Sequence, residues 1–134
     1  MLSLLYLSYS LIPDDMADRE VQNIVDTSVV NNKSTGLTGA LMFTGVNFCQ
    51  FLEGPEHAVR GLMESICVDT RHRDIWTVHE KAVSDRRFGN WSMAYRGRSS
   101  FVNGHLMDLL GASVEVERAK SVKSIITMME EFVK

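Results

Sequence analysis

The order of strand-like and helix-like segments is the feature of this sequence that most constrains its fold. Apolar runs predict strands, and apolar residues spaced three or four apart predict helices that bury one face. The strand-like runs cover residues 2–8, 37–43, 46–52, 75–83 and 91–95. The helical patterns comprise Val21, Ile24, Val25 and Val29, then Val59, Leu62, Met63 and Ile66. This order predicts an α+β fold of ferredoxin-like type, a mixed five-stranded sheet with two helices on one face.

Turn-forming residues separate these segments. Pro13-Asp14-Asp15 predicts the start of the first helix with an aspartate cap. Asn31 to Gly36 predicts its end, because these residues tolerate left-handed backbone. Thr44-Gly45 predicts a hairpin, and Gly54-Pro55 predicts the start of the second helix, which should stop near Asp69.

The last third of the chain has a helical pattern again, beginning at about Phe101. A short apolar patch, Leu106, Leu109 and Leu110, precedes a longer stripe of Val122, Ile125, Ile126, Met129 and Val133. We therefore expect residues 1–98 to form one domain and residues 99–134 a C-terminal helical extension. The stripe either packs on the sheet face opposite the first two helices, or also offers a dimer or partner surface, since eight methionines allow adaptable contacts.

Composition excludes several classes of function. The net charge of -3 and the lack of a basic run disfavour nucleic acid as a partner. No stretch approaches the roughly 18 apolar residues of a membrane span, and the start lacks a basic signal region, so we expect a cytoplasmic protein without a membrane partner. Cys49 and Cys67 fit a reducing compartment as two small core residues, with a disulfide as the alternative.

Motifs for metal binding or catalysis are missing from the sequence. The histidines show no metal-ligand spacing, and there is no Gly-rich phosphate loop or nucleophile elbow. We therefore expect no metal and no enzyme. Arg71, Arg73 and Asn31 keep open the alternative of a small anion-binding hydrolase of ferredoxin-like fold.

Polar residues interrupt the apolar strand faces. Alternation places Tyr6 and Ser8 on one face, and Gln50 in an apolar row of the third strand. Trp91 and Met93 share a face of the last strand, together with Tyr95. If the helices cover these faces, a phenol, a carboxamide and an indole lie in the interior, where an unpaired group costs about 1–3 kcal/mol. Such groups satisfy one another or hold a ligand, and with Asn31-Asn32 they would border a slot for a flat ligand with an amide-like edge.

Several blocks of the sequence together resemble a known family. They are Leu5-Tyr6-Leu7-Ser8, Asn31-Asn32, Gly36-Leu37-Thr38-Gly39, Phe48-Cys49-Gln50-Phe51-Leu52-Glu53-Gly54-Pro55, Asp69-Thr70-Arg71-His72-Arg73 and Phe88-Gly89-Asn90-Trp91-Ser92-Met93. Over residues 2–97 they resemble the BLUF domain, the blue-light sensor using FAD. The resemblance implies a non-covalent flavin between the two helices, FAD in the first place, with FMN or riboflavin as alternatives.

The resemblance also implies roles for individual residues. Tyr6 would be the photoactive phenol and Gln50 the carboxamide between it and the flavin, while Trp91 and Met93 would respond to the switch. The implied flavin-binding residues are Tyr6, Ser8, Gln50 and Met93, with Asn31 and Asn32 at the pyrimidine edge, Ile24 and Ile66 against the ring faces, and Arg71 and His72 toward the phosphates. Two positions depart from the pattern: Ser65 stands where many relatives have Arg, and Leu37 replaces the commoner Ile.

The implied function is that of a blue-light photoreceptor. Electron and proton transfer from Tyr6 would rearrange the hydrogen bonds of Gln50, shift the absorption slightly to the red, and signal through the last strand to the C-terminal helices. Because only about 35 residues follow the sensor, we expect output through a separate signalling protein or through a homo-oligomer. The alternatives are a flavin-binding module without light signalling and the small anion-binding hydrolase.

Overall fold

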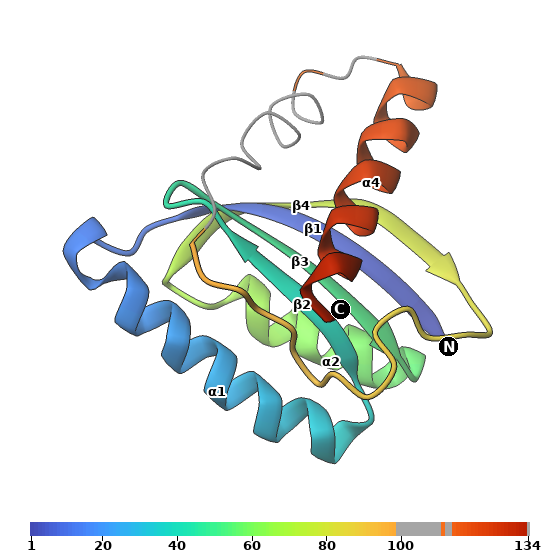
Figure 1. The fold of residues 1–134 in the computed structure, drawn as a ribbon, viewed down its shortest axis with the longest axis horizontal. Coiled ribbons are helices and arrows are strands. Elements are labelled where there is room, and N and C mark those ends of the chain that lie inside the picture. The colour runs from blue at the N-terminus through green and yellow to red at the C-terminus, as the bar shows by residue number, and fades with distance from the viewer. Residues whose placement is uncertain (99–110, 112–113, 134) are drawn as a thin grey trace.

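The computed structural model describes residues 1–98, 111 and 114–133. Strands alternate with helices along these residues in the predicted order (Figure 1). The elements are β1 (Leu2–Ser10), η1 (Asp14–Met16), α1 (Ala17–Thr35), β2 (Thr38–Phe43), β3 (Asn47–Gly54), α2 (Glu56–Cys67), β4 (His72–Ala82), α4 (Glu115–Glu130) and η3 (Glu131–Val133). The hairpin at Thr44-Gly45 and the start of α2 after Pro55 are confirmed.

The sheet has the strand order β2-β3-β1-β4, and each neighbouring pair is antiparallel. This arrangement confirms the ferredoxin-like α+β fold. The predicted fifth strand is wrong for the described residues, because residues 91–95 form only one parallel bridge, between Ala94 and Ala40 of β2. A turn that joins the Trp91 amide to the Phe88 carbonyl precedes this segment, so only a short length of chain reaches the edge of β2.

The ends of α1 differ in how well the sequence predicts them. Gly36 ends the helix in the left-handed conformation, with φ of 77°, as predicted. The aspartate cap is wrong: Asp14 lies in η1, and neither η1 nor α1 has a side-chain cap. The Asp14 carboxylate instead pairs with the Arg98 guanidinium at 2.8 Å, a contact from a distant part of the sequence.

Two hydrophobic clusters lie on opposite faces of the sheet. Val21 and Val25 of α1 and Val59 of α2 pack in one cluster, against β-strand residues that include Tyr6. α4 crosses the other face (Figure 1), where its buried side chains are Val122, Ile125, Ile126 and Met129. The prediction that the C-terminal stripe packs opposite the first two helices is therefore confirmed, whereas Leu106, Leu109 and Leu110 lie outside the described residues.

The two cysteines have different environments. Cys49 is buried in β3, while Cys67 is exposed at the end of α2, and both are free thiols. The expectation of two core residues is thus wrong for Cys67, because it lies on the outward face of the last turn of α2. None of the described helices has the length and hydropathy needed to cross a membrane.

We expect Ile125→Ala to lower the free energy of unfolding by about 2–5 kcal/mol, because the fully buried Ile125 side chain joins α4 to the sheet. Val116→Ala is the matched control on the same helix, since Val116 is 68% exposed and its loss should change stability by no more than about 0.5 kcal/mol. Urea unfolding of both variants measures the difference. Equal stabilities would contradict the packing of α4 on the sheet.

Candidate functional site

A cavity of about 190 Å³ lies between α1 and α2, with the sheet as its floor. Its walls are mostly apolar and its edges carry amide, hydroxyl and charged groups. The lining residues are Tyr6, Ile24, Thr27, Ser28, Asn31, Leu41, Phe48, Gln50, Leu62, Ser65, Ile66, Asp69, Arg71 and His72. Apolar walls with a few convergent polar groups are typical of a small-molecule site.

Helical spacing explains which residues of α1 and α2 reach the cavity. Ile24, Thr27, Ser28 and Asn31 are separated by three or four residues, so they lie on one face of α1. Leu62, Ser65 and Ile66 share a face of α2 in the same way. The Asn31 side-chain amide makes no hydrogen bond within the described part of the chain, so it remains available to a ligand.

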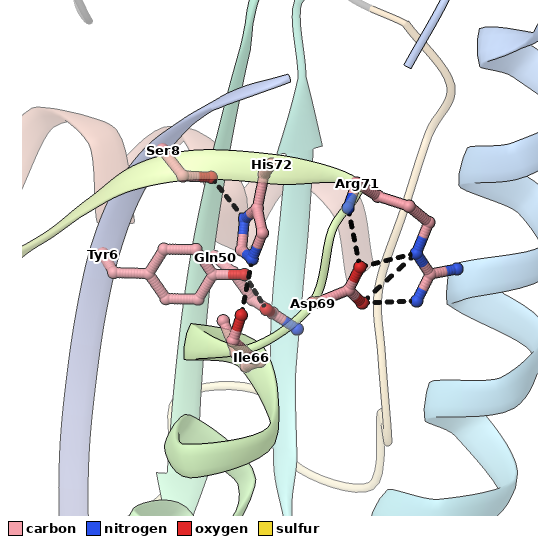
Figure 2. Close-up of polar contacts among 7 residues, drawn as sticks. All are labelled: Tyr6, Ser8, Gln50, Ile66, Asp69, Arg71 and His72. Atoms are coloured by element: carbon pink, nitrogen blue, oxygen red, sulfur yellow. Dashed lines mark hydrogen bonds and ion pairs between the residues drawn. The ribbon is translucent and has the colours of Figure 1, made fainter. Parts of the chain in front are cut away.

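A chain of buried hydrogen bonds runs along the floor of the cavity. The Tyr6 hydroxyl donates to Gln50 Oε1 at 2.5 Å (Figure 2). Gln50 Nε2 in turn donates to the thioether sulfur of Met93 at 3.7 Å. The contact between β1 and β3 follows from the strand register, because Tyr6 and Gln50 are directly opposite each other. A phenol and a carboxamide therefore lie side by side with a third polarisable group behind them.

Burial raises the pKa of the Tyr6 phenol well above its ordinary value of about 10, and the neighbouring Cys49 and Asp69 add to the shift. The side chain is only 3% exposed, so a phenolate would be poorly solvated there. Tyr6 is therefore a neutral hydrogen-bond donor across the whole physiological pH range. Within that range it loses its proton only if another event first makes the phenol more acidic.

His72 joins three elements at the end of the cavity. Its Nε2 lies 2.7 Å from the Ile66 carbonyl of α2, and its Nδ1 lies 2.7 Å from the Ser8 hydroxyl of β1 (Figure 2). Because a carbonyl only accepts, Nε2 must carry a proton, and in the neutral ring Nδ1 then accepts from Ser8. Both ring nitrogens are occupied, so His72 fixes β4 against α2 and β1 and borders the cavity with its ring.

Arg71 and Asp69 form an ion pair at the mouth of the cavity. The guanidinium Nη2 lies 2.6 Å from Asp69 Oδ2, and Nε also donates to the same carboxylate (Figure 2). These bonds lower the pKa of the Asp69 carboxyl, although partial burial opposes the shift. Nη1 of Arg71 takes no part in this ion pair.

Glu53 holds the segment that carries Met93. Its carboxylate is fully buried at the end of β3 and accepts hydrogen bonds from the backbone amides of Arg87 and Phe88, each at 2.8 Å. The Thr38 hydroxyl donates to the same carboxylate at 2.9 Å. Charge-assisted bonds of this kind are strong, so the start of residues 87–94 is tied to the sheet.

Most of the predicted binding residues meet at the cavity. Those that line it are Tyr6, Ile24, Asn31, Gln50, Ile66, Arg71 and His72. Ser8 and Met93 lie just behind this wall, bonded to His72 and Gln50. The buried Asn32 amide donates to the Ser92 carbonyl at 2.9 Å instead of lining the cavity.

The expected interior indole is wrong. Trp91 is 50% exposed, whereas Met93 is buried and packs with the cluster under the helices. The prediction assumed strand alternation through residues 91–95, but this segment has only one bridge to the sheet, so alternation does not fix the direction of Trp91.

Sequence reasoning missed several lining residues, among them Thr27, Ser28 and Asp69. Helical spacing could have identified Thr27 and Ser28, because they lie between Ile24 and Asn31 on the same face of α1. The hydrolase alternative gains no support: Arg73 points to Asp74 and Tyr9 and does not join Arg71, and the described residues include no group of three or more possible metal ligands.

Comparison with known proteins agrees with these features. The family model "BLUF: Sensors of blue-light using FAD" matches residues 1–94. The chain is 35% identical over 91 residues to the "Blue light- and temperature-regulated antirepressor BluF" of Escherichia coli, covering 68% of this chain and 22% of that protein. It is 31% identical over 90 residues to "Photoactivated adenylate cyclase subunit alpha" of Euglena gracilis, covering 67% of this chain but 9% of that protein.

Solved structures extend the similarity over most of the chain. The dark-state structure of "BlrB - a BLUF protein" has 31% identity and a TM-score of 0.68, and the match covers 91% of this chain and 96% of that one. The ground state of BlsA has a TM-score of 0.79 at 22% identity, with 96% and 87% covered, which supports the fold. The match thus extends across nearly the whole of BlrB but only a fraction of the curated relatives.

We expect Tyr6 to contribute no phenolate below pH about 10, because burial raises its pKa. The ultraviolet phenolate absorbance of the protein and of Tyr6→Phe should therefore coincide up to that pH. The two curves should separate only in more alkaline solution, as Tyr6 ionises or the fold opens. A difference between the curves that develops below pH about 10 would show that the phenol is accessible to water.

Proposed function

The chain belongs to the BLUF family of blue-light sensors using FAD, and on that premise we propose that its light signal starts at the bonded side chains of Tyr6, Gln50 and Met93. It has the features of a flavin-binding blue-light sensor, and we infer that these residues act as a sensor rather than as an enzyme. The observation that carries the proposal is the buried chain of hydrogen bonds at the cavity floor. It puts a phenol, and a carboxamide with two bonding states, beside the cavity between α1 and α2, which we call the flavin slot.

The residues of the slot fit a flavin. Ile24 of α1 and Ile66 of α2 are on opposite walls and would pack against the faces of the ring system. Asn31, whose amide has no partner in the described residues, would bind the pyrimidine edge. Asn32 would act indirectly, since its bond to the Ser92 carbonyl positions the segment before Met93. Arg71 would use its remaining Nη1 toward a phosphate, while Ser65 supplies a hydroxyl instead of a cation at the α2 wall.

A bound flavin would supply the absorption of blue light and an acceptor for one electron from a neighbouring phenol. Tyr6 is that phenol, and its hydroxyl proton already points to Gln50 Oε1. Loss of an electron makes a phenol far more acidic, which overcomes the raised pKa of Tyr6 and allows its proton to move along this bond. Gln50 would then rotate or tautomerise, and the electron and the proton would return to Tyr6. The amide would be left with its donor and acceptor exchanged toward its neighbours.

The rearranged amide would act next on Met93. The Gln50 bond to the Met93 sulfur depends on which end of the carboxamide faces it, because a thioether accepts but does not donate. Met93 packs in the cluster under α1 and α2, while the next residue, Ala94, packs in the cluster that contains α4. A shift of Met93 would therefore be transmitted to Ala94 and to the surface on which α4 rests.

The light signal of this chain would pass to a separate signalling protein or act through assembly into a homo-oligomer. The relatives named as an antirepressor and as an adenylate cyclase show that such sensors occur with different outputs. In this chain residues 1–98 would be the sensor, and residues 99–134 the extension that transmits its state. A cytoplasmic location remains a prediction.

An absorption spectrum of the FAD-loaded protein, recorded in the dark and under blue light, tests the function. We expect a yellow protein whose flavin bands shift reversibly to the red. Bands that stay fixed would favour a flavin-binding module without signalling, and protein that stays colourless after FAD is supplied would contradict the site itself.

We expect Gln50→Leu to bind flavin and to lose the red shift, because Asn31 and the apolar walls remain while the switching amide is gone. Gln22→Leu is the matched control: Gln22 is exposed on α1, bonded to Asp26, and its replacement should leave the shift intact. Light-minus-dark difference spectra of both variants measure the effect. An undiminished shift in Gln50→Leu would refute the role of this amide.

We expect Tyr6→Phe to abolish the normal photocycle, because phenylalanine has no hydroxyl proton to pass to Gln50. The control is Tyr9→Phe on the same strand, whose ring lies beneath Arg73 and away from the slot. Flash illumination followed by absorption over time compares the two. If Tyr6→Phe cycles as the unmodified protein does, another residue supplies the electron.

A further inference from the structure

A second cavity, of about 460 Å³, lies on the face of the sheet opposite the flavin slot, between β4 and the first three turns of α4. Its volume falls within the range of about 300–1,000 Å³ that is usual for small-molecule sites. The cavity has an apolar floor and a mostly cationic rim. Its lining residues are Val78, His79, Arg87, Glu115, Arg118, Ala119, Val122, Lys123, Ile126 and Thr127.

Arg118 is the residue that most needs an explanation. Its Nε is buried, and in the part of the chain that the structure describes this donor has no hydrogen-bond partner. The guanidinium lies over the Trp76 ring, 5.2 Å from the ring centroid, so a cation–π contact holds it in place. Arg118 as a whole is only half-buried, but a buried guanidinium nitrogen normally has an acceptor, and an unmatched one is a recognised sign of an unseen ion or ligand.

The surrounding charges are positive, although the whole chain has a net charge of -3. Arg118 and Lys123 form no ion pair among the described residues, and Glu115 is the only acidic group of the lining. Arg87 adds a third cation, which pairs with Glu130 at 3.0 Å. The pKa of His79 is lowered by burial and then by the charges of Arg87 and Lys81, which reports the positive potential of this region.

We propose that this cavity is a binding site for a small organic anion, whose charged group meets Arg118 and Lys123 and whose apolar part lies on Val78, Val122 and Ile126. A carboxylate, sulfonate or phosphate supplies the acceptor that Nε of Arg118 lacks. The apolar floor favours an anion with a hydrocarbon or aromatic body over a bare inorganic ion. The site is separate from the flavin slot and requires neither flavin nor light.

Calorimetric titration of the FAD-loaded full chain in the dark tests the site, with 8-anilinonaphthalene-1-sulfonate as the anionic probe. N-phenyl-1-naphthylamine, which lacks the sulfonate, is its neutral counterpart. We expect one sulfonate probe per chain and binding of the neutral compound at least about tenfold weaker, because the charged group makes the decisive contact. Equal binding of both compounds would contradict an anion site.

Variants locate the binding. Arg118→Gln should weaken sulfonate binding at least about tenfold, and Lys123→Gln should weaken it less because a lysine is a flexible point charge. Lys120→Gln removes the same charge from an exposed position of α4 outside the lining and should leave the affinity unchanged. An effect of Lys120→Gln equal to that of Arg118→Gln would reduce the site to diffuse surface charge and overturn the proposal.

A steric variant covers the case in which Arg118→Gln disturbs α4. Ala119→Phe keeps every charge but places a ring in the cavity, so we expect it to lose sulfonate binding while far-ultraviolet circular dichroism retains the helix signal. The flavin spectrum should be unchanged, since the flavin slot is on the other face of the sheet. Unaltered sulfonate binding in Ala119→Phe would place the probe elsewhere and refute the assignment.

Discussion

The pairing register of β1 with β3 is the constraint on which the rest of the site depends. It sets Tyr6 directly opposite Gln50, and both side chains emerge on the face that α1 and α2 cover. A slip of one residue would turn Tyr6 toward α4 and bring Leu5 under the flavin slot, because side chains alternate between the two faces. Burial on both faces prevents that slip: Leu5, Leu7 and Phe51 fill the cluster beneath α4. The core that stabilises the fold thus also fixes the hydrogen bond on which the proposed light response rests.

The segment that would receive the proposed signal is held differently from the sheet. Its start is tied firmly by the buried Glu53 carboxylate, which accepts the amides of Arg87 and Phe88. Further along, the backbone bonds to β2 at Trp91 and at Ala94, and the Asn32 side chain bonds to the Ser92 carbonyl. Segments with few backbone hydrogen bonds open at lower free energy than core strands. Residues 91–95 therefore follow a firmly held start and are themselves weakly paired, which suits the proposal that they shift when Gln50 changes partners.

Local patterns predicted what depends on periodicity, and they failed where a distant partner decides. Alternation correctly placed Tyr6 and Gln50 on one face, and the run from Asn31 to Gly36 correctly ended α1. The Asp14 cap failed because Arg98 competes for the carboxylate, and the direction of Trp91 failed because residues 91–95 are not a strand. His72 lines the cavity as a predicted site residue, but the bonds of its two ring nitrogens to Ser8 and Ile66 were not predicted. No spacing rule reveals such contacts, since each joins elements that meet only after the chain has folded.

The two cavities share the sheet that separates them. The flavin slot has Tyr6 and Gln50 of β1 and β3 on its floor. The second cavity, with Arg118 and Lys123 on its rim, lies between β4 and α4. α4 in turn packs against Leu5, Leu7 and Phe51 of the same strands β1 and β3. An anion bound at Arg118 would hold α4 to β4 and so favour the docked helix by mass action. If a change at Gln50 and Met93 alters how α4 sits on Ala94, the free-energy coupling must act in both directions. The affinity for the anion would then depend on illumination, and the lifetime of the light state would depend on the anion concentration. The same sheet would thus couple the response to light to the binding of a small molecule.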